Sequence, residues 1–185
     1  MSRVTVEEAV RVLEEADCLY TPAEVDRAVE RLAEAIRRDL ADRNPLVLSV
    51  LTGGIVLTGH LVTRLDFPLQ LDYLHATRYR GGTHGGELAW IAHPRFSLAS
   101  RHLLIVDDIL DEGLTLQAVV AHCREAGAAS VSTAVLVRKR HDRRPPDIDA
   151  DYVGLEVEDR YVFGFGMDYH DYHRNLPGIY AVREG

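Results

Sequence analysis

The sequence predicts an α/β domain in which a parallel sheet is covered by helices on both faces. Apolar, strand-like runs alternate with helix-like segments along most of the chain, a pattern typical of this class. The strand-like runs are mostly apolar, as strands are when both faces of the sheet are buried. The chain has 185 residues, 46% of them hydrophobic, which suits one domain with a substantial core.

The first two predicted elements are helices that begin at capping boxes. In a capping box, a threonine and a glutamate three residues later each accept a hydrogen bond from the backbone N–H of the other. Two pairs have this spacing, Thr5 with Glu8 and Thr21 with Glu24. Pro22 adds a residue favoured in the first helical turn. The second helix has one apolar face, which consists of Val25, Ala28, Val29, Leu32, Ile36 and Leu40.

The middle of the chain alternates between strands and helices. Strands are expected at residues 45–51, 69–76, 103–107 and 131–137, and helices at residues 55–65 and 114–127. Ligands of such folds bind beyond the carboxyl ends of the strands. Two unusual segments, 51–54 (LTGG) and 107–113 (DDILDEG), fall at such ends. We therefore expect the functional site there.

Global features exclude several classes of function. A net charge of −8 argues against general nucleic-acid binding, which needs a basic surface, although it leaves a phosphate ligand possible through backbone N–H groups. No apolar run approaches the length of a membrane span, and the N-terminus has no signal-peptide pattern. Cys18 and Cys123 are not clustered, which indicates neither a disulfide framework nor a zinc site; Cys123 is expected in the core. The expected compartment is the cytoplasm.

The segment 103–116, LLIVDDILDEGLTL, carries the strongest chemical signal. An apolar strand runs into four carboxylates, Asp107, Asp108, Asp111 and Glu112. A helix N-terminus follows at Leu114, and such an end binds anions through its free N–H groups. Carboxylates beside an anion site can accept hydrogen bonds from sugar hydroxyls, bind Mg²⁺ or take up a proton. The alternative is a solvated turn in which Gly113 supplies an unusual φ.

This segment resembles the phosphoribosyl pyrophosphate (PRPP) signature of the type I phosphoribosyltransferases. Further stretches narrow the resemblance, over about residues 15–185, to the hypoxanthine-guanine (6-oxopurine) members: the pyrophosphate loop at 51–54, the lysine-bearing strand end at 136–139, the base-binding hood at 159–169, and Arg174. The resemblance implies a type I phosphoribosyltransferase fold in one domain, 1–185. Its core would span about 20–150, and its hood would combine the N-terminal segment with about 155–185.

The resemblance also implies roles for the acidic segment. Asp107 and Asp108 would hold the ribose hydroxyls, partly through Mg²⁺, and Asp111 would be the general base for the purine N7 proton. Its acidic neighbours are expected to keep its proton affinity high. The 5′-phosphate would be bound by residues 111–115, which add Glu112, Gly113, Leu114 and Thr115. Pyrophosphate would be bound by Thr52, Gly53 and Arg174.

The purine would be bound by four further residues. By resemblance, Lys139 donates to the 6-oxo group, Tyr161 stacks on the ring, and Val162 pairs through its backbone. Asp168 would lie at the base and ligate a second Mg²⁺. The implied cofactor is Mg²⁺, the implied substrates are PRPP and a 6-oxopurine, and the products are IMP or GMP and pyrophosphate. No nucleic-acid or membrane partner is expected, and the protein would be a homodimer or homotetramer.

Some residues depart from the family pattern. Thr52 stands where many members have lysine, so backbone N–H groups must contribute more there. The family often has a cis peptide at this position, which implies one at Leu51–Thr52. Glu112 replaces a hydroxyl residue and is expected to point away from the phosphate. Arg78-Tyr79 replaces Ser-Tyr at the start of a glycine-rich flap, 78–90, which is expected to be mobile.

Other interpretations stay open. A phospho-receiver domain also has an acidic pair after a strand, and a regulatory RNA-binding protein can share the phosphoribosyltransferase fold. Within enzymes, xanthine preference is the alternative. Asp168, His170, Asp171 and His173 imitate a metal cluster, although a polar loop is the simpler interpretation. Without the family, the run 138–144 (RKRHDRR) would be a solvated turn, and the alternation at 161–163 would indicate a strand with one buried face.

Overall fold

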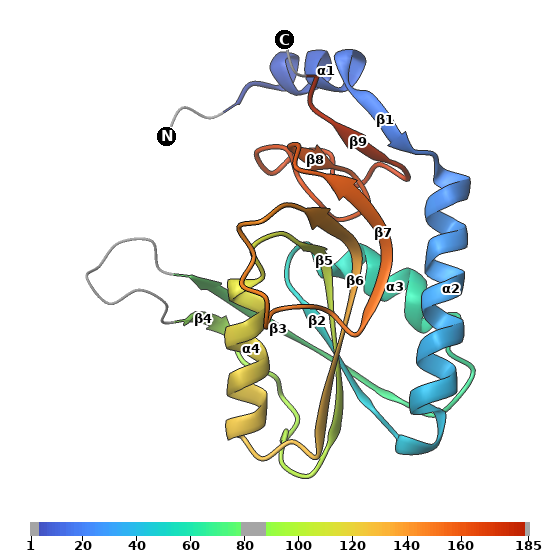
Figure 1. Ribbon diagram of the computed structural model, residues 1–185, viewed down its shortest axis with the longest axis vertical. Helices are drawn as coiled ribbons and strands as arrows, with labels where there is room; N and C mark the ends of the chain where they lie inside the picture. Colours follow the sequence, from blue (N-terminus) through green and yellow to red (C-terminus); the bar gives the residue numbers. More distant parts are fainter. Residues whose placement is uncertain (1–3, 79–87, 184–185) are drawn as a thin grey trace.

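The computed structural model describes residues 4–78 and 88–183 and contains two sheets. The larger has six strands in the order β4-β3-β2-β5-β6-β7, and the smaller has three in the order β1-β9-β8 (Figure 1). The strands of the larger sheet are β2 (Leu46–Val50), β3 (Gln70–Arg78), β4 (Leu88–Ala92), β5 (His102–Leu110), β6 (Ser130–Arg140) and β7 (Tyr152–Glu158). Those of the smaller are β1 (Asp17–Tyr20), β8 (Val162–Phe163) and β9 (Ile179–Ala181).

The larger sheet is parallel across β3, β2, β5, β6 and β7, as the sequence predicts. Val47, in the central strand β2, lies opposite Leu71 of β3 and Leu104 of β5. The edge strand β4 pairs antiparallel with β3. Neither β4 nor β7 was predicted, and residues 79–87 of the expected flap lie outside the described residues.

Helices cover both faces of this sheet. The helices are α1 (Val6–Glu15), α2 (Pro22–Leu40), α3 (Gly54–Val62) and α4 (Leu114–Glu125), and a short 3₁₀ turn, η1 (Ala41–Arg43), follows α2. Figure 1 shows α2 and α3 on one side of the sheet and α4 on the other. Two separate clusters of buried side chains fill these two layers. The covered parallel sheet of the predicted fold class is therefore confirmed.

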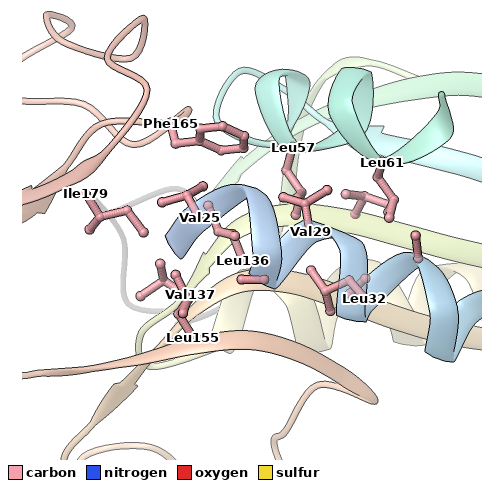
Figure 2. Close-up of a cluster of buried hydrophobic side chains, with 14 of the residues drawn as sticks. Val25, Val29, Leu32, Leu57, Leu61, Leu136, Val137, Leu155, Phe165 and Ile179 are labelled. Atoms are coloured by element: carbon pink, nitrogen blue, oxygen red, sulfur yellow. The ribbon is translucent and has the colours of Figure 1, made fainter. Parts of the chain in front are cut away.

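The predicted apolar face of α2 forms the centre of the first cluster. Val25, Val29 and Leu32 lie against Leu136 and Leu155 of the sheet (Figure 2). All six residues predicted for this face are buried. Burying one such side chain contributes about 1.5–3 kcal/mol, so the helix is held mainly by packing. Cys123, on the buried face of α4, is also in the core as predicted.

The predicted helix starts are also confirmed. The Thr5 hydroxyl accepts the Glu8 N–H at 3.2 Å at the start of α1. At the start of α2, the Glu24 carboxylate accepts the Thr21 N–H at 2.8 Å.

Among the described residues, no helix combines the length and the apolar character that crossing a membrane would require.

The smaller sheet joins the two ends of the described chain and lies beyond the carboxyl ends of the larger sheet (Figure 1). Arg160, just before β8, pairs with Asp17 of β1 at 2.5 Å. The alternative interpretation of 161–163, a strand with one buried face, is wrong: Tyr161 is exposed, whereas Val162 and Phe163 are both buried. Val162 packs into the first core cluster, and Phe163 stacks against Tyr180 of β9. Each face of this short strand therefore has a partner.

Candidate active site

The acidic segment begins inside a strand rather than after one. Strand β5 continues through Asp107 and Asp108 to Leu110, because β6 extends alongside it and pairs Asp107 with Val135 and Leu110 with Arg138. The prediction that the strand ends at residue 107 is thus wrong by three residues. Asp111 and Glu112 form the turn that follows, before α4 begins at Leu114.

Asp108 is buried and Asp107 is partly buried, and the pair has little positive charge around it. The pKa of both carboxyl groups is raised, first because burial removes them from water; for Asp107 the neighbouring charge of Asp108 adds to this. The nearest cation found for Asp108 is Arg174, at 4.0 Å. Oxygen donors whose negative charge is poorly balanced fit a hard divalent cation such as Mg²⁺.

The predicted pyrophosphate loop packs directly against this pair. A Cβ added to Gly53 would lie 2.0 Å from the Asp108 Oδ2 atom, so only glycine fits there. The peptide bond between Leu51 and Thr52 is cis, as expected. A Cβ added to Gly166 would lie 2.3 Å from the Gly53 carbonyl oxygen. The loop, strand β5 and the segment after β8 therefore meet at one point.

The N-terminus of α4 has the form expected of an anion site. Gly113 stands before the helix with φ 77°, and a Cβ there would lie 2.4 Å from Ile148. Because Gly113 has no side chain, it provides no side-chain cap for the helix, and the first N–H groups of an α-helix have no partner within it. Leu114 and Thr115 open the helix. Glu112 is exposed and lies 3.9 Å from the Arg143 guanidinium.

Asp111 is hydrogen-bonded to Lys139 and His141 rather than to the acidic residues that precede it in the sequence. The Lys139 ammonium donates to its Oδ2 atom at 2.8 Å, and the His141 ring nitrogen Nε2 lies 2.7 Å from its Oδ1 atom. Partial burial acts to raise the pKa of Asp111, but the hydrogen bonds of Lys139 and His141 and the charge of Lys139 outweigh it and lower the pKa. The expectation that acidic neighbours keep its proton affinity high is therefore wrong. Asp107 and Asp108 are neighbours in sequence, yet they do not determine its charge.

The basic run 138–144 is only partly a solvated turn: residues 138–140 end strand β6, and an exposed turn follows at 142–143. Arg138 pairs with Asp149 at 2.8 Å and also with Glu156. The Lys139 side chain is only 12% exposed and that of His141 only 5%. Lys139 lies near the end of β6 and His141 is the first residue after it, and residues two apart along a strand direction point to the same face. This spacing is the signal by which His141 could have been found from the sequence.

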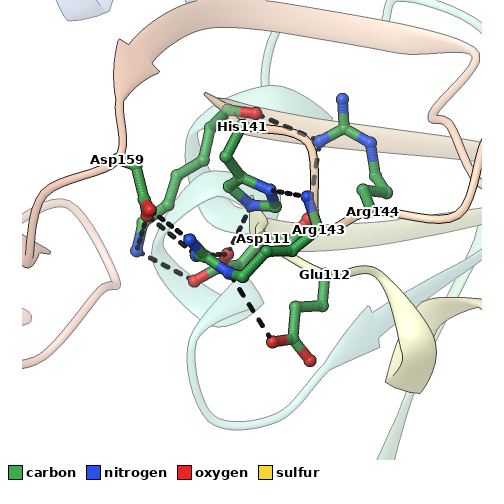
Figure 3. A network of polar contacts seen from close by, with 7 residues as sticks. Asp111, Glu112, His141, Arg143, Arg144 and Asp159 are labelled. Atoms are coloured by element: carbon green, nitrogen blue, oxygen red, sulfur yellow. Dashed lines mark hydrogen bonds and ion pairs between the residues drawn. The ribbon is translucent and has the colours of Figure 1, made fainter.

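Asp159 and Arg143 complete this network and were also missed as site residues. Figure 3 shows the Asp111 carboxylate facing the His141 ring, with Arg143 between Asp111 and Asp159. A hydrogen bond from Arg143, against a smaller opposing effect of burial, lowers the pKa of Asp159 to about 2. Asp111, His141 and Asp159 have potential metal-ligand atoms within 4.8 Å of one another. Lys139 and Arg143 pair with both carboxylates and so balance much of their charge.

A pocket of about 200 Å³ brings all four predicted purine-binding residues together. Asp111, Lys139, Tyr161, Val162 and Asp168 all line it, along with Asp108. Tyr161, the residue just before β8, is 49% exposed.

Arg174 connects this pocket with the acidic pair. Its guanidinium lies 2.7 Å from Asp168 and 4.0 Å from Asp108, and it donates to the Gly166 carbonyl at 2.6 Å. The predicted site residues therefore form one continuous region, which extends from the Gly53 loop through Asp108 to the pocket.

Among the described residues, the histidines of the polar loop 168–173 do not gather with Asp168 and Asp171 into a group of metal ligands. Asp168 pairs with Arg174 and accepts the Asp171 N–H at 2.8 Å. His173 is within hydrogen-bonding distance, 2.7 Å, of the Ala9 carbonyl oxygen in α1. These contacts hold the loop to its neighbours and support the simpler of the two interpretations.

Comparison with known proteins agrees with this geometry. The family model of the phosphoribosyl transferase domain matches residues 15–171. The chain is 35% identical to the hypoxanthine-guanine phosphoribosyltransferase of Bacillus subtilis, over 89% of this chain and 92% of that protein. It is 32% identical to the hypoxanthine-guanine-xanthine phosphoribosyltransferase of Tritrichomonas foetus, over 90% and 91%.

A solved structure gives the same result. The hypoxanthine phosphoribosyltransferase of Staphylococcus aureus superimposes with a TM-score of 0.87 and 27% identity, covering 97% of both chains. These relatives are named as enzymes, which favours catalysis over the phospho-receiver and RNA-binding alternatives. Since the family model, the relatives and the fold agree, the chain belongs to the phosphoribosyltransferase family, among the hypoxanthine-guanine phosphoribosyltransferases.

Proposed function

We propose that the protein transfers the 5-phosphoribosyl group of PRPP to N9 of hypoxanthine or guanine, giving IMP or GMP and pyrophosphate. The pocket that places Asp111, Lys139 and Tyr161 together carries this proposal. A carboxylate beside an ammonium group offers an acceptor and a donor side by side. This pair matches the N7–H and 6-oxo edge of a 6-oxopurine, and the exposed Tyr161 ring offers a face for stacking.

The reaction follows from these contacts. N9 forms a bond to C1′ as the bond from C1′ to the pyrophosphate oxygen breaks, and the N7 proton passes to Asp111. Lys139 donates to the 6-oxo group and so disfavours adenine, whose amino group at that position is itself a donor. Val162 contributes through its backbone. Catalysis is then mainly positioning and electrostatic stabilisation of the developing cation.

PRPP would be bound along the rest of the site. Asp107 and Asp108 would hold the ribose hydroxyls, and residues 111–115 would bind the 5′-phosphate at the N-terminus of α4. Thr52, Gly53 and Arg174 would bind pyrophosphate. The contact of Gly53 with Asp108, and the reach of Arg174 toward both Asp108 and Asp168, support a single extended binding surface.

Mg²⁺ is the cofactor that these residues fit. Asp107 and Asp108 would hold one ion with PRPP, and Asp168 would hold a second. When bound, the ions neutralise the pyrophosphate leaving group. The burial that raises the pKa of both Asp107 and Asp108 supports this assignment, because a cation would balance their charge. Removing Mg²⁺ with a chelator should abolish turnover, and adding it back should restore it.

A PRPP-dependent assay with hypoxanthine, guanine, xanthine and adenine side by side tests the proposal. Formation of IMP or GMP with stoichiometric pyrophosphate, and essentially no use of adenine, is the expected result. Efficient use of adenine would contradict the role of Lys139. Xanthine is included because the Tritrichomonas foetus relative carries xanthine in its name.

We further propose that the protein works in the cytoplasm as a homodimer or homotetramer, with one catalytic domain, 1–185, per chain. Exposed apolar side chains support self-association: Ile55, Leu71 and Tyr73 surround a hollow of about 680 Å³ beside Leu51. The division into a six-stranded and a three-stranded sheet supports the expected core and hood, respectively. Light scattering on the wild type and on Tyr73→Arg tests the assembly, and a monomeric wild type would contradict it.

A further inference from the structure

His141 makes a contact that the proposed roles do not use. Its Nε2 atom lies 2.7 Å from the Asp111 Oδ1 atom, and its side chain is 5% exposed (Figure 3). The pocket is lined by Asp111 and Lys139 but not by His141. The ring therefore lies behind the carboxylate, away from the place where a ligand would enter.

The hydrogen bonds around this ring assign its tautomer. The Arg143 backbone N–H donates to the His141 Nδ1 atom at 3.2 Å. A ring nitrogen that accepts a hydrogen bond has no proton, so the proton of the neutral ring is on Nε2. Nε2–H therefore donates to the Asp111 Oδ1 atom. The loop that begins at the end of β6 thus presents a fixed donor to this carboxylate.

The two oxygens of Asp111 have different kinds of partner. Oδ2 is bonded at 2.8 Å by Lys139, whose flexible side chain lines the pocket and can turn toward a ligand oxygen. Oδ1 is bonded by His141, a ring held in place by burial and by the Arg143 backbone. When Lys139 moves to the 6-oxo group, Oδ2 becomes free and Oδ1 does not.

We propose that His141 is a positioning residue: it holds Oδ1 of Asp111 so that Oδ2 faces the N7 proton of the bound purine. This inference rests on the proposed function, in which Asp111 is the general base. Three charged groups face Asp111. Lys139 of β6 pairs with it, and the Arg143 guanidinium, in the loop after β6, lies 3.6 Å from its Oδ1 atom. The third is Asp159, beyond β7, which forms an ion pair with Arg143. The residue that hydrogen-bonds Oδ1 from behind the pocket is His141.

Three substitutions separate this role from simple packing. His141→Ala removes the donor, His141→Asn keeps an amide too short to reach Oδ1, and His141→Gln places an amide nitrogen near the position of Nε2. We expect kcat to fall about 10- to 100-fold in the alanine and asparagine variants, as when a hydrogen bond to a charged group is lost. The glutamine variant should recover most of that loss. The KM for PRPP should stay within about twofold in all three.

The pH profile gives a second readout. Since the His141 hydrogen bond is one of the contacts that lower the pKa of Asp111, its loss should move the acidic limb of kcat/KM to higher pH. The shift should appear in His141→Ala and His141→Asn but not in His141→Gln. Arg140→Ala, an exposed neighbour in the same basic run, is the matched control and should leave kcat and the acidic limb unchanged.

The outcomes distinguish the inference from the function on which it rests. If the wild type shows no PRPP-dependent activity with any of the four bases, the proposed function fails. If the wild type is active and His141→Ala matches it in kcat and in pH profile, His141 is not a positioning residue. Should the alanine variant not fold, the comparison of glutamine with asparagine decides: equal kcat values in these two would overturn the proposal. In an Asp111→Asn background, His141→Ala should cause no further loss.

Discussion

Gly53 and Asp108 touch so closely that a Cβ on Gly53 would lie 2.0 Å from the Asp108 carboxylate oxygen. One residue belongs to the loop after β2 and the other to β5, so the contact joins the two strand ends on which the site is built. Any side chain at position 53 must displace a buried carboxylate.

Gly53→Ala should therefore lower both stability and activity. Overpacking of this kind costs about 1–3 kcal/mol, and the displaced Asp108 would no longer face PRPP. Denaturant unfolding and a PRPP titration measure the two effects. Gly59→Ala is the matched control: no atom lies within 4 Å of its added Cβ in the exposed part of α3, and the change from glycine should stabilise the helix by about 0.8–1 kcal/mol. Equal behaviour of the two variants would contradict the contact.

Asp111→Asn should lower kcat by about 10²–10⁴, the contribution of a positioned general base, while PRPP binding changes much less. The carboxamide keeps the shape of the side chain and removes its ability to take the N7 proton. Asp107→Asn should show the opposite balance, with weaker PRPP binding, because its role is to hold the ribose. Steady-state kinetics and PRPP calorimetry on both variants provide the comparison. A near-normal kcat in Asp111→Asn would place the base elsewhere.

The ion pair between Lys139 and Asp111 should make folding stability depend on pH in a defined direction. The folded pKa of Asp111 is lowered from its ordinary value of 3.8. The stabilisation is therefore present above that value and is lost as the pH falls through the lower folded value. The difference in Tm between wild type and Lys139→Met should be constant near neutral pH and shrink in acid. Arg140→Met, which changes an exposed arginine, should show no such dependence; a pH-independent Tm difference for Lys139→Met would contradict the pairing.

Trp90, the tryptophan of the chain, should report ligand binding. Its ring stacks on His93 at 4.5 Å and lies 4.5 Å from the His122 ring of α4. The resemblance to the phosphoribosyltransferases implies that the glycine-rich flap, 78–90, closes over PRPP. Mg²⁺-PRPP with an unreactive purine analogue should then change Trp90 emission and protect this segment from proteolysis. Replacing Gly82 and Gly85 by proline should slow turnover more than it weakens purine binding. If neither emission nor protease sensitivity responds, the segment is not a lid.

Local signals account for the parts of the fold that were predictable. Capping residues such as Thr5 and Thr21 act within one helical turn, and the six apolar residues of α2 reveal a buried face by their spacing alone. The strands β1, β8 and β9 were not predictable in the same way. They are two to four residues long, and the two outer partners come from opposite ends of the chain. A run that short has no measurable period, so only its partner makes it a strand.

The sequence by itself determined which chemical groups are available: the acids of residues 107–112, Lys139, Tyr161, Asp168 and Arg174, and the sheet edge on which they gather. Tertiary structure alone decided how they are charged and paired. Asp111 lies three residues from Asp108, yet its contacts are Lys139 and His141, 28 and 30 residues away along the chain. Electrostatic interaction falls with distance in space and not with separation in sequence. For that reason the residue expected to hold its proton more tightly holds it less tightly in the folded protein.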